Sequence, residues 1–219
     1  MENEACWCGS GKAYADCHKI IDDKIAILRK QGQEVPDRDM IKTPEQIAGI
    51  REACKINTAV LDEVAKHVKA GMTTADIDRI VYDFTVAHDA IPAPLGFCGF
   101  PKSVCTSVND QVCHGIPDEK VVLRSGDIVN VDVSTIYKGY YADASRMFMI
   151  GKVNKQAADL VAIAKQCLQR GIDAAQPWAH LGDIGAAVSQ LARKHGYSVV
   201  EEFGGCLLYT SPSPRDYAA

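Results

Sequence analysis

Residues 126–149 read GDIVNVDVSTIYKGYYADASRMFM, and this stretch decides the fold. β-Branched residues alternate with other residues before Lys138-Gly139, and the whole stretch reads as two antiparallel strands joined there by a two-residue turn. Gly139 suits the positive φ that such a turn demands. The turn fixes the register, which pairs Tyr137 with Tyr140, Ser134 with Asp143, and Asp132 with Ser145.

The predicted register places two carboxylates, those of Asp132 and Asp143, on one face of the hairpin. They are diagonal neighbours, with Cβ atoms about 7 Å apart in a regular ladder. Because two carboxylates held close among apolar residues repel each other unless a proton or a cation intervenes, the pair is a candidate metal site. Spacing alone leaves a second interpretation open, in which one aspartate caps a turn and the other faces solvent.

Helices are predicted before and after the hairpin. Thr43-Pro44-Glu45-Gln46 carries a capping box with proline at the first helical position, and the helix that follows ends near Gly71. Three- and four-residue steps predict its buried face to be Ile47, Ile50, Cys54, Leu61, Val64 and Val68. Further predictions are a helix capped by Thr73 or Thr74, a loop over 91–101, strands near 104–108, 121–122 and 197–203, and helices over 154–172 and 181–195.

The composition limits the kind of protein this can be. The 219 residues hold 24 Lys and Arg against 28 Asp and Glu, a net charge of −4, and 47% are hydrophobic, which excludes disorder and collagen. A slightly acidic chain lacks the basic surface of a general nucleic-acid binder, so no specific DNA partner is expected. No apolar run approaches the roughly 20 residues of a membrane span, and the start MENE is unlike a signal peptide. We expect a soluble, cytoplasmic protein without a membrane partner.

Four soft metal ligands crowd the first eighteen residues: Cys6, Cys8, Cys17 and His18. Three thiolates and an imidazole suit Zn²⁺, and a segment this short cannot build a core without such a metal. The alternatives are reduced, unstructured thiols or a redox pair. The pattern resembles the SEC-C motif, with its Gly-Ser-Gly-Lys turn at 9–12 and an aromatic residue at Tyr14. The remaining cysteines are scattered and are predicted to be buried thiols, Cys54 and Cys167 among them.

The composition changes along the chain and divides it into four parts. Residues 1–19 form the predicted zinc module. A polar helix from Lys19 to about Gln33 and a charged linker containing Pro36 make up residues 20–40. Residues 41–205 form the main domain, and 206–219 form a tail.

Over residues 41–205 the chain resembles a type I methionine aminopeptidase of the pita-bread metallopeptidase fold, an α+β fold. The resemblance rests on these motifs: IKTPE (41–45), GFPKSVC (99–105), VN (108–109), CHGIP (113–117), GDIVNVDV (126–133), AD (142–143), MF (147–148) and FGG (203–205). It implies a cytosolic enzyme that removes methionine from the N-termini of nascent polypeptides. The zinc module is then a candidate contact for the ribosome.

The resemblance also implies roles for single residues. In the family, two aspartates, a histidine and two glutamates hold a pair of divalent ions of the Co, Mn, Fe or Zn class, and Asp132 and Asp143 match the two aspartates. His114 matches a histidine that contacts the substrate near the scissile amide. Phe97, Phe100 and Cys105 match the pocket for the methionine side chain. The alternative is that His114 is a turn histidine paired with a backbone group and that Phe97 and Phe100 take part in ordinary core packing.

The sequence departs from the family after Gly205. Cys206 stands where the family has its metal-binding histidine, and residues 206–219 hold no carboxylate that could replace the missing glutamates. We therefore expect this chain to be inactive as given. Three alternatives follow: a non-catalytic pita-bread binding protein, a zinc-dependent docking module, and a prolidase-like member of the fold.

Overall fold

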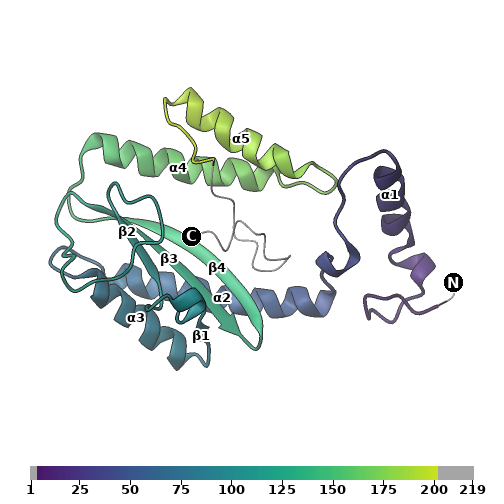
Figure 1. Cartoon of the computed structure of the whole chain (residues 1–219), viewed down its shortest axis with the longest axis horizontal. Helices are drawn as coiled ribbons and strands as arrows, with labels where there is room; N and C mark the ends of the chain where they lie inside the picture. Colours follow the sequence, from purple (N-terminus) through teal and green to yellow (C-terminus); the bar gives the residue numbers. More distant parts are fainter. Residues whose placement is uncertain (1–3, 202–219) are drawn as a thin grey trace.

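The computed structural model describes residues 4–201 (Figure 1). The motif at 203–205, Cys206 and the tail 206–219 lie outside the described residues. A membrane-crossing helix, apolar and long enough for a bilayer, does not occur in the described part of the chain.

One four-stranded antiparallel sheet is built around β3 (Ile128–Tyr137). β4 (Tyr140–Met149) pairs with one edge of β3, whereas β1 (Ile91–Pro92) and β2 (Cys105–Val108) share its other edge, one beyond the other. The predicted hairpin register is confirmed at every pair named above. Lys138 and Gly139 have φ values of 50° and 81°, which is the conformation that the two-residue turn requires.

Two helices cover one face of the sheet, α2 (Pro44–His67) and α3 (Thr74–Ala87) (Figure 1). Both begin with a capping box, and the cap of α3 is Thr73. Odd-numbered residues of β3 point toward these helices. The buried core comprises Val60, Leu61, Val64, Ile77, Val81, Val104, Leu123, Val129, Val131, Val133 and Ile150. The even-numbered residues of β3 therefore face away from the core.

The buried face of α2 differs from the prediction. Ile47 is 40% exposed and Cys54 is exposed, whereas Ala53 and Asn57 are buried. Asn57 Oδ1 accepts a hydrogen bond of 2.7 Å from the Thr135 hydroxyl in the middle of β3. Small and hydrogen-bonding side chains let the helix approach the sheet closely, and a count of apolar residues does not detect them.

Two predicted strands are wrong. Residues 121–122 form only an isolated bridge, because their backbone pairs with the start of α3: Thr74 N donates to Val121 O at 3.0 Å. The described part of the predicted strand at 197–203 has no strand conformation, since none of residues 4–201 offers it a ladder partner. The predicted loop 91–101 also contains β1 and a short 3-10 helix, η3 (Phe97–Gly99).

The two helices after the hairpin are confirmed as α4 (Lys155–Ala174) and α5 (Leu181–Lys194). They lie side by side (Figure 1), with Gly171 of α4 facing Val188 and Ile184 of α5. The thiol of Cys167 is buried between them, as predicted.

The N-terminal segment lies at one end of the molecule, away from the sheet (Figure 1). It contains the 3-10 helix η1 (Tyr14–Asp16) and α1 (Lys19–Lys30), and a 3-10 turn, η2 (Arg38–Met40), precedes α2.

Gly49 of α2 faces the ring of Tyr140, the first residue of β4, so closely that a Cβ atom there would overlap the ring. We expect Gly49→Ala to lower the free energy of unfolding by about 1–3 kcal/mol, because the ring must leave its position. Gly185→Ala on α5 is the matched control. Its Cβ would meet nothing within 4 Å, so the better helix propensity should raise stability by up to about 1 kcal/mol. Urea unfolding measures both, and equal effects of the two variants would contradict the contact.

Candidate metal centres

Asp132 and Asp143 lie on the sheet face that points away from α2 and α3. On β3 they share this face with Asn130 and Ser134, and on β4 with Ser145. The predicted placement of both carboxylates on one face is therefore confirmed. Asp132 is half-buried and Asp143 is exposed.

Burial raises the pKa of Asp132 to about 6, and the charge of Asp143 adds to the shift, while His114 opposes it. Cys105 lies directly opposite Asp132 on β2. Burial and the same two carboxylates raise the pKa of the Cys105 thiol to about 12. At neutral pH Cys105 is therefore a small uncharged group and neither a nucleophile nor a ready thiolate ligand.

The raised pKa of Asp132 carries a stability prediction. Because the folded-state pKa of about 6 lies above the ordinary value of about 4, the folded chain binds this proton more tightly than the unfolded chain does. Ionising Asp132 therefore destabilises the fold, and stability is lost as the pH rises from about 4 to about 6. The difference between the two pKa values corresponds to about 3 kcal/mol.

We expect Asp132→Asn to raise the unfolding free energy of the metal-free domain by up to about 3 kcal/mol at pH 7.5, and by almost nothing at pH 3.5. Denaturant titrations at the two pH values measure this, with the exposed Asp159→Asn as the control. The same stabilisation at both pH values would show that ionisation of Asp132 is not its cause.

The hydroxyl of Ser134 donates a 2.6 Å hydrogen bond to Asp143 Oδ1. The sequence placed Ser134 opposite Asp143 but did not predict this bond. Cross-strand pairing was the signal that could have found it, since directly opposed side chains lie about 5 Å apart.

His114 occupies a tight segment beside β2 and has a φ of 54°, in the left-handed region. The next residue, Gly115, accepts from Thr106 N at 2.8 Å and donates to the Ser107 hydroxyl at 3.2 Å. A Cβ at Gly115 would overlap the carbonyl oxygen of Thr106. His114 is thus held by a backbone contact that only glycine permits, and it is near enough to Asp132 to affect its pKa.

The loop that carries Phe97 and Phe100 is anchored beside the carboxylates at both ends. At its start Ala93 N donates to Ser134 O at 2.9 Å, and at its end Cys105 pairs with Asp132. Gly96 N donates to Phe100 O at 2.8 Å and closes the loop. Phe97 is 55% exposed, so core packing is not its role, whereas Phe100 is half-buried. Their assignment to a methionine pocket stays a prediction.

Asp78 of α3 anchors the same loop, which the sequence did not reveal. Its carboxylate accepts from Ser103 N at 2.7 Å and lies 3.4 Å from the Lys102 ammonium. In the sequence alone, an aspartate on an amphipathic helix cannot be distinguished from a charge on the solvent-exposed face, because its partner in the loop is not known.

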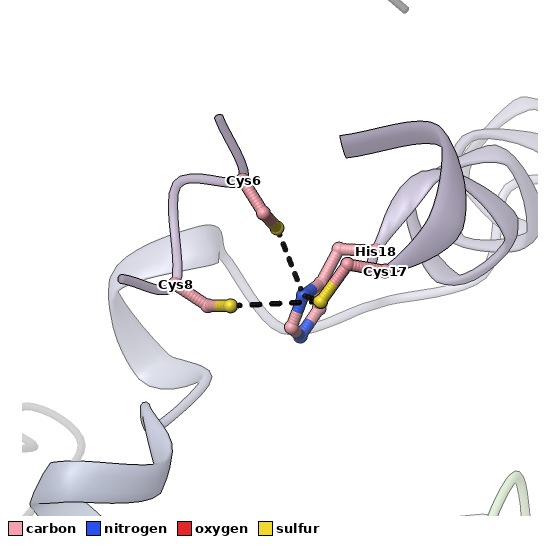
Figure 2. A group of neighbouring side chains, drawn as sticks. All are labelled: Cys6, Cys8, Cys17 and His18. Atoms are coloured by element: carbon pink, nitrogen blue, oxygen red, sulfur yellow. Dashed lines mark hydrogen bonds between the residues drawn. The ribbon is translucent and has the colours of Figure 1, made fainter. Parts of the chain in front are cut away.

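The second centre is the N-terminal cluster, whose four side chains converge as Figure 2 shows. The candidate ligand atoms of Cys6, Cys8, Cys17 and His18 all lie within 4.8 Å of one another. Cys8 Sγ lies 3.7 Å from Cys17 Sγ, and His18 Nδ1 lies 3.2 Å from the sulfur atoms of Cys6 and Cys17. A tetrahedral zinc with Zn–S bonds of about 2.3 Å separates its sulfur atoms by about 3.8 Å, so the set fits one zinc ion. In residues 4–201 it is the only cluster of three or more such groups.

The electrostatics of the cluster favour a bound cation. A hydrogen bond from Ser10 lowers the pKa of Cys8 to about 6, whereas burial raises the pKa of Cys6. The predicted turn at 9–12 supplies Ser10, and it is closed by a bond of 2.8 Å from Cys6 N to Lys12 O. Cys8 is therefore the thiol that ionises more readily for a metal, while Cys6 ionises only when a metal binds it.

Asp22 of α1 joins the cluster to the segment that follows. Its Oδ2 accepts from Trp7 Nε1 at 3.2 Å, from the Tyr14 hydroxyl at 2.8 Å and from Arg38 at 2.8 Å. The Nζ atom of Lys24 on α1 also lies 3.8 Å from the centre of the Trp178 ring. Trp178 belongs to the connection between α4 and α5. The bond from Asp22 to Arg38 and the contact of Arg38 with the Trp7 ring tie the predicted linker back to the module.

Known proteins resemble both parts of the chain. The sequence model of metallopeptidase family M24 matches residues 48–209, and that of the SEC-C motif matches residues 3–19. A methionine aminopeptidase from Chlamydia pneumoniae is 41% identical over 206 residues, which cover 93% of this chain and 70% of that protein. Methionine aminopeptidase A from Synechocystis is 46% identical over 176 residues, covering 78% of this chain and 70% of that protein.

The likeness extends to three dimensions. The crystal structure of a methionine aminopeptidase from Rickettsia prowazekii matches with a TM-score of 0.72 and 44% identity, covering 73% of this chain and 64% of that one. The chain therefore spans 64–70% of the length of these three relatives.

Proposed function

The chain belongs to metallopeptidase family M24, and from this premise we propose that it is a methionine aminopeptidase, which removes methionine from the N-termini of nascent proteins in the cytoplasm. Membership of the family and the α+β pita-bread fold confirm the expectations from the sequence. The observation that carries the proposal is the pair of carboxylates, Asp132 and Asp143, on the sheet face opposite α2 and α3.

In this proposal Asp132 and Asp143 hold the divalent ions, whose chemistry when bound is to activate water and polarise the scissile carbonyl. The raised pKa of Asp132 supports this role, because a half-buried carboxylate beside a second one gains stability from a nearby cation. The histidine and the two glutamates that complete the site in the family have no counterpart in residues 4–201 or in residues 206–219.

The chain's other residues bind and orient the peptide. His114, fixed by the contact of Gly115 with Thr106, hydrogen-bonds the substrate near the scissile amide and stabilises charge that develops there. Phe97, Phe100 and Cys105 receive the methionine side chain. An uncharged Cys105 thiol supports this assignment, because a thioether prefers an apolar surrounding.

We also infer that Cys6, Cys8, Cys17 and His18 hold one structural zinc ion. Four protein ligands close the tetrahedron and leave no position for water, so this zinc takes no part in hydrolysis. The module that it folds is a candidate contact for the ribosome, where nascent N-termini appear.

A hybrid protein tests the proposed function. Residues 1–201 are joined to the C-terminal segment of the Rickettsia prowazekii enzyme, which is 44% identical, and assayed on a Met-Ala-Ser peptide with Co²⁺, Mn²⁺ or Fe²⁺. The hybrid is expected to release methionine, whereas the chain alone is expected to show no turnover, since residues 4–201 bring only two carboxylates together. A hybrid that folds and binds metal but releases no methionine would contradict the proposal.

A further inference from the structure

The two carboxylates on the exposed sheet face are held in different ways. Asp132 lies on the central strand and is half-buried. Asp143 is exposed on β4, which within residues 4–201 pairs only with β3. Burial restricts the side chain of Asp132, whereas an exposed aspartate would ordinarily sample several rotamers. Some other contact must fix Asp143 if it is to bind a metal in one orientation.

We propose that Ser134 is the positioning residue that fixes the carboxylate of Asp143 for metal binding, an inference that rests on the proposed function. Its Oγ lies 2.6 Å from Asp143 Oδ1, within the range of charge-assisted O–H···O⁻ bonds, which are about twice as strong as neutral ones. The bond uses one lone pair of Oδ1 and leaves Oδ2 and the other lone pair of Oδ1 for a cation.

Ser134 is itself rigidly placed, which a positioning residue must be. Its backbone is paired with Asp143 on one side, and on the other side its carbonyl accepts from Ala93 N at 2.9 Å. The segment that begins at Ala93 leads into the loop with Phe97 and Phe100. Ser134 therefore borders both the carboxylate of Asp143 and the proposed methionine pocket. Partners of metal ligands typically contribute about 10–100-fold to metal affinity.

Ser145 offers a matched control on the same face. It lies opposite Asp132, as Ser134 lies opposite Asp143. Its hydroxyl oxygen, however, accepts a hydrogen bond of 3.4 Å from Asn130 Nδ2, and within residues 4–201 no bond from this hydroxyl to a carboxylate is found. Ser145→Ala removes the same atom from the same face without touching Asp143.

The first test is the rotamer of Asp143 in the metal-free chain, measured by three-bond NMR couplings across its Cα–Cβ bond. We expect a single rotamer in the wild type and in Ser145→Ala, averaged couplings in Ser134→Ala, and recovery in Ser134→Thr, which keeps the hydroxyl. Averaged couplings in the wild type, or unchanged couplings in Ser134→Ala, would overturn the inference. Amide spectra of each variant show whether the sheet remains intact.

The second test measures Mn²⁺ binding by electron paramagnetic resonance, which detects the free ion. The N-terminal cluster is first filled with zinc, and Mn²⁺ is the probe because it prefers oxygen ligands. Ser134→Ala is expected to weaken Mn²⁺ binding about 10–100-fold, Ser134→Thr to restore it, and Ser145→Ala to leave it unchanged. Mn²⁺ affinity unaltered by Ser134→Ala but lost in Asp143→Ala would overturn the role of Ser134. Affinity unaltered even in Asp143→Ala would instead contradict the proposed metal site, while the rotamer measurement still decides the role of Ser134.

Discussion

Replacing Cys17 by serine is expected to remove one equivalent of zinc and to unfold residues 4–30, while the sheet and its two helices keep their stability. The reason is that Cys6 and Cys8 are the only buried apolar residues within 4–30, so the proposed zinc, with a binding energy of about 10–16 kcal/mol in such modules, is expected to supply the folding energy. The structure extends the affected region beyond the motif itself. Asp22 joins Trp7, Tyr14 and Arg38, so the bonds that place Arg38 are lost with the module.

Metal analysis and hydrogen exchange measure the two parts of this result. Amides of residues 4–30 are expected to lose protection in Cys17→Ser, and those of β3 to retain it. Cys54→Ser is the matched control, because Cys54 is an exposed thiol on α2 and should bind no zinc. Loss of protection in β3 together with the zinc would show that the module and the main domain do not fold independently.

In the hybrid enzyme, Asp143→Ala is expected to abolish release of methionine, because it removes one of the two carboxylates of the proposed metal site. His114→Ala is expected to retain the metals and to lower kcat by about 10²–10³, the effect of losing one hydrogen bond to the transition state. The two variants therefore separate metal binding from transition-state stabilisation.

Rates on Met-Ala-Ser and metal content of each purified variant provide the measurement. Asp83→Ala, an exposed carboxylate on α3, serves as the control and is expected to leave both unchanged. Turnover that survives Asp143→Ala would remove this residue from the metal site. A hybrid that binds its metals yet prefers Xaa-Pro peptides would replace the methionine assignment with a prolidase-like one.

The hairpin was predictable from the sequence in full, because a two-residue turn fixes every cross-strand pair once its position is known. The carboxylate pair and the cysteine cluster followed from such local patterns. The positions of β1 and β2 along one edge of β3 could not be predicted in this way, because a strand of two residues and one of four carry little periodicity of their own.

Residues whose role depends on distant partners were also missed. Asp22 and Asp78 are ordinary helical carboxylates in the sequence, and their roles arise from segments up to 25 residues away. Cys54 was predicted to be buried because it is apolar, yet the close approach of α2 to the sheet selects Ala53 and Asn57. The face of a helix is decided by what it packs against as well as by its own apolar residues.

The turn at Lys138-Gly139 also bears on the order in which the protein folds. Asp132 and Asp143 are eleven residues apart in the chain, whereas β1 pairs with residues of β3 that lie about 45 positions further along the chain. Hairpins close in about 1–10 μs, and pairing between distant segments is slower. A lone hairpin is only marginally stable, but α2 and α3 precede it in the chain and are already synthesised when it leaves the ribosome. Both carboxylates are therefore expected to be in place, and open to a metal ion, while the rest of the polypeptide is still being translated.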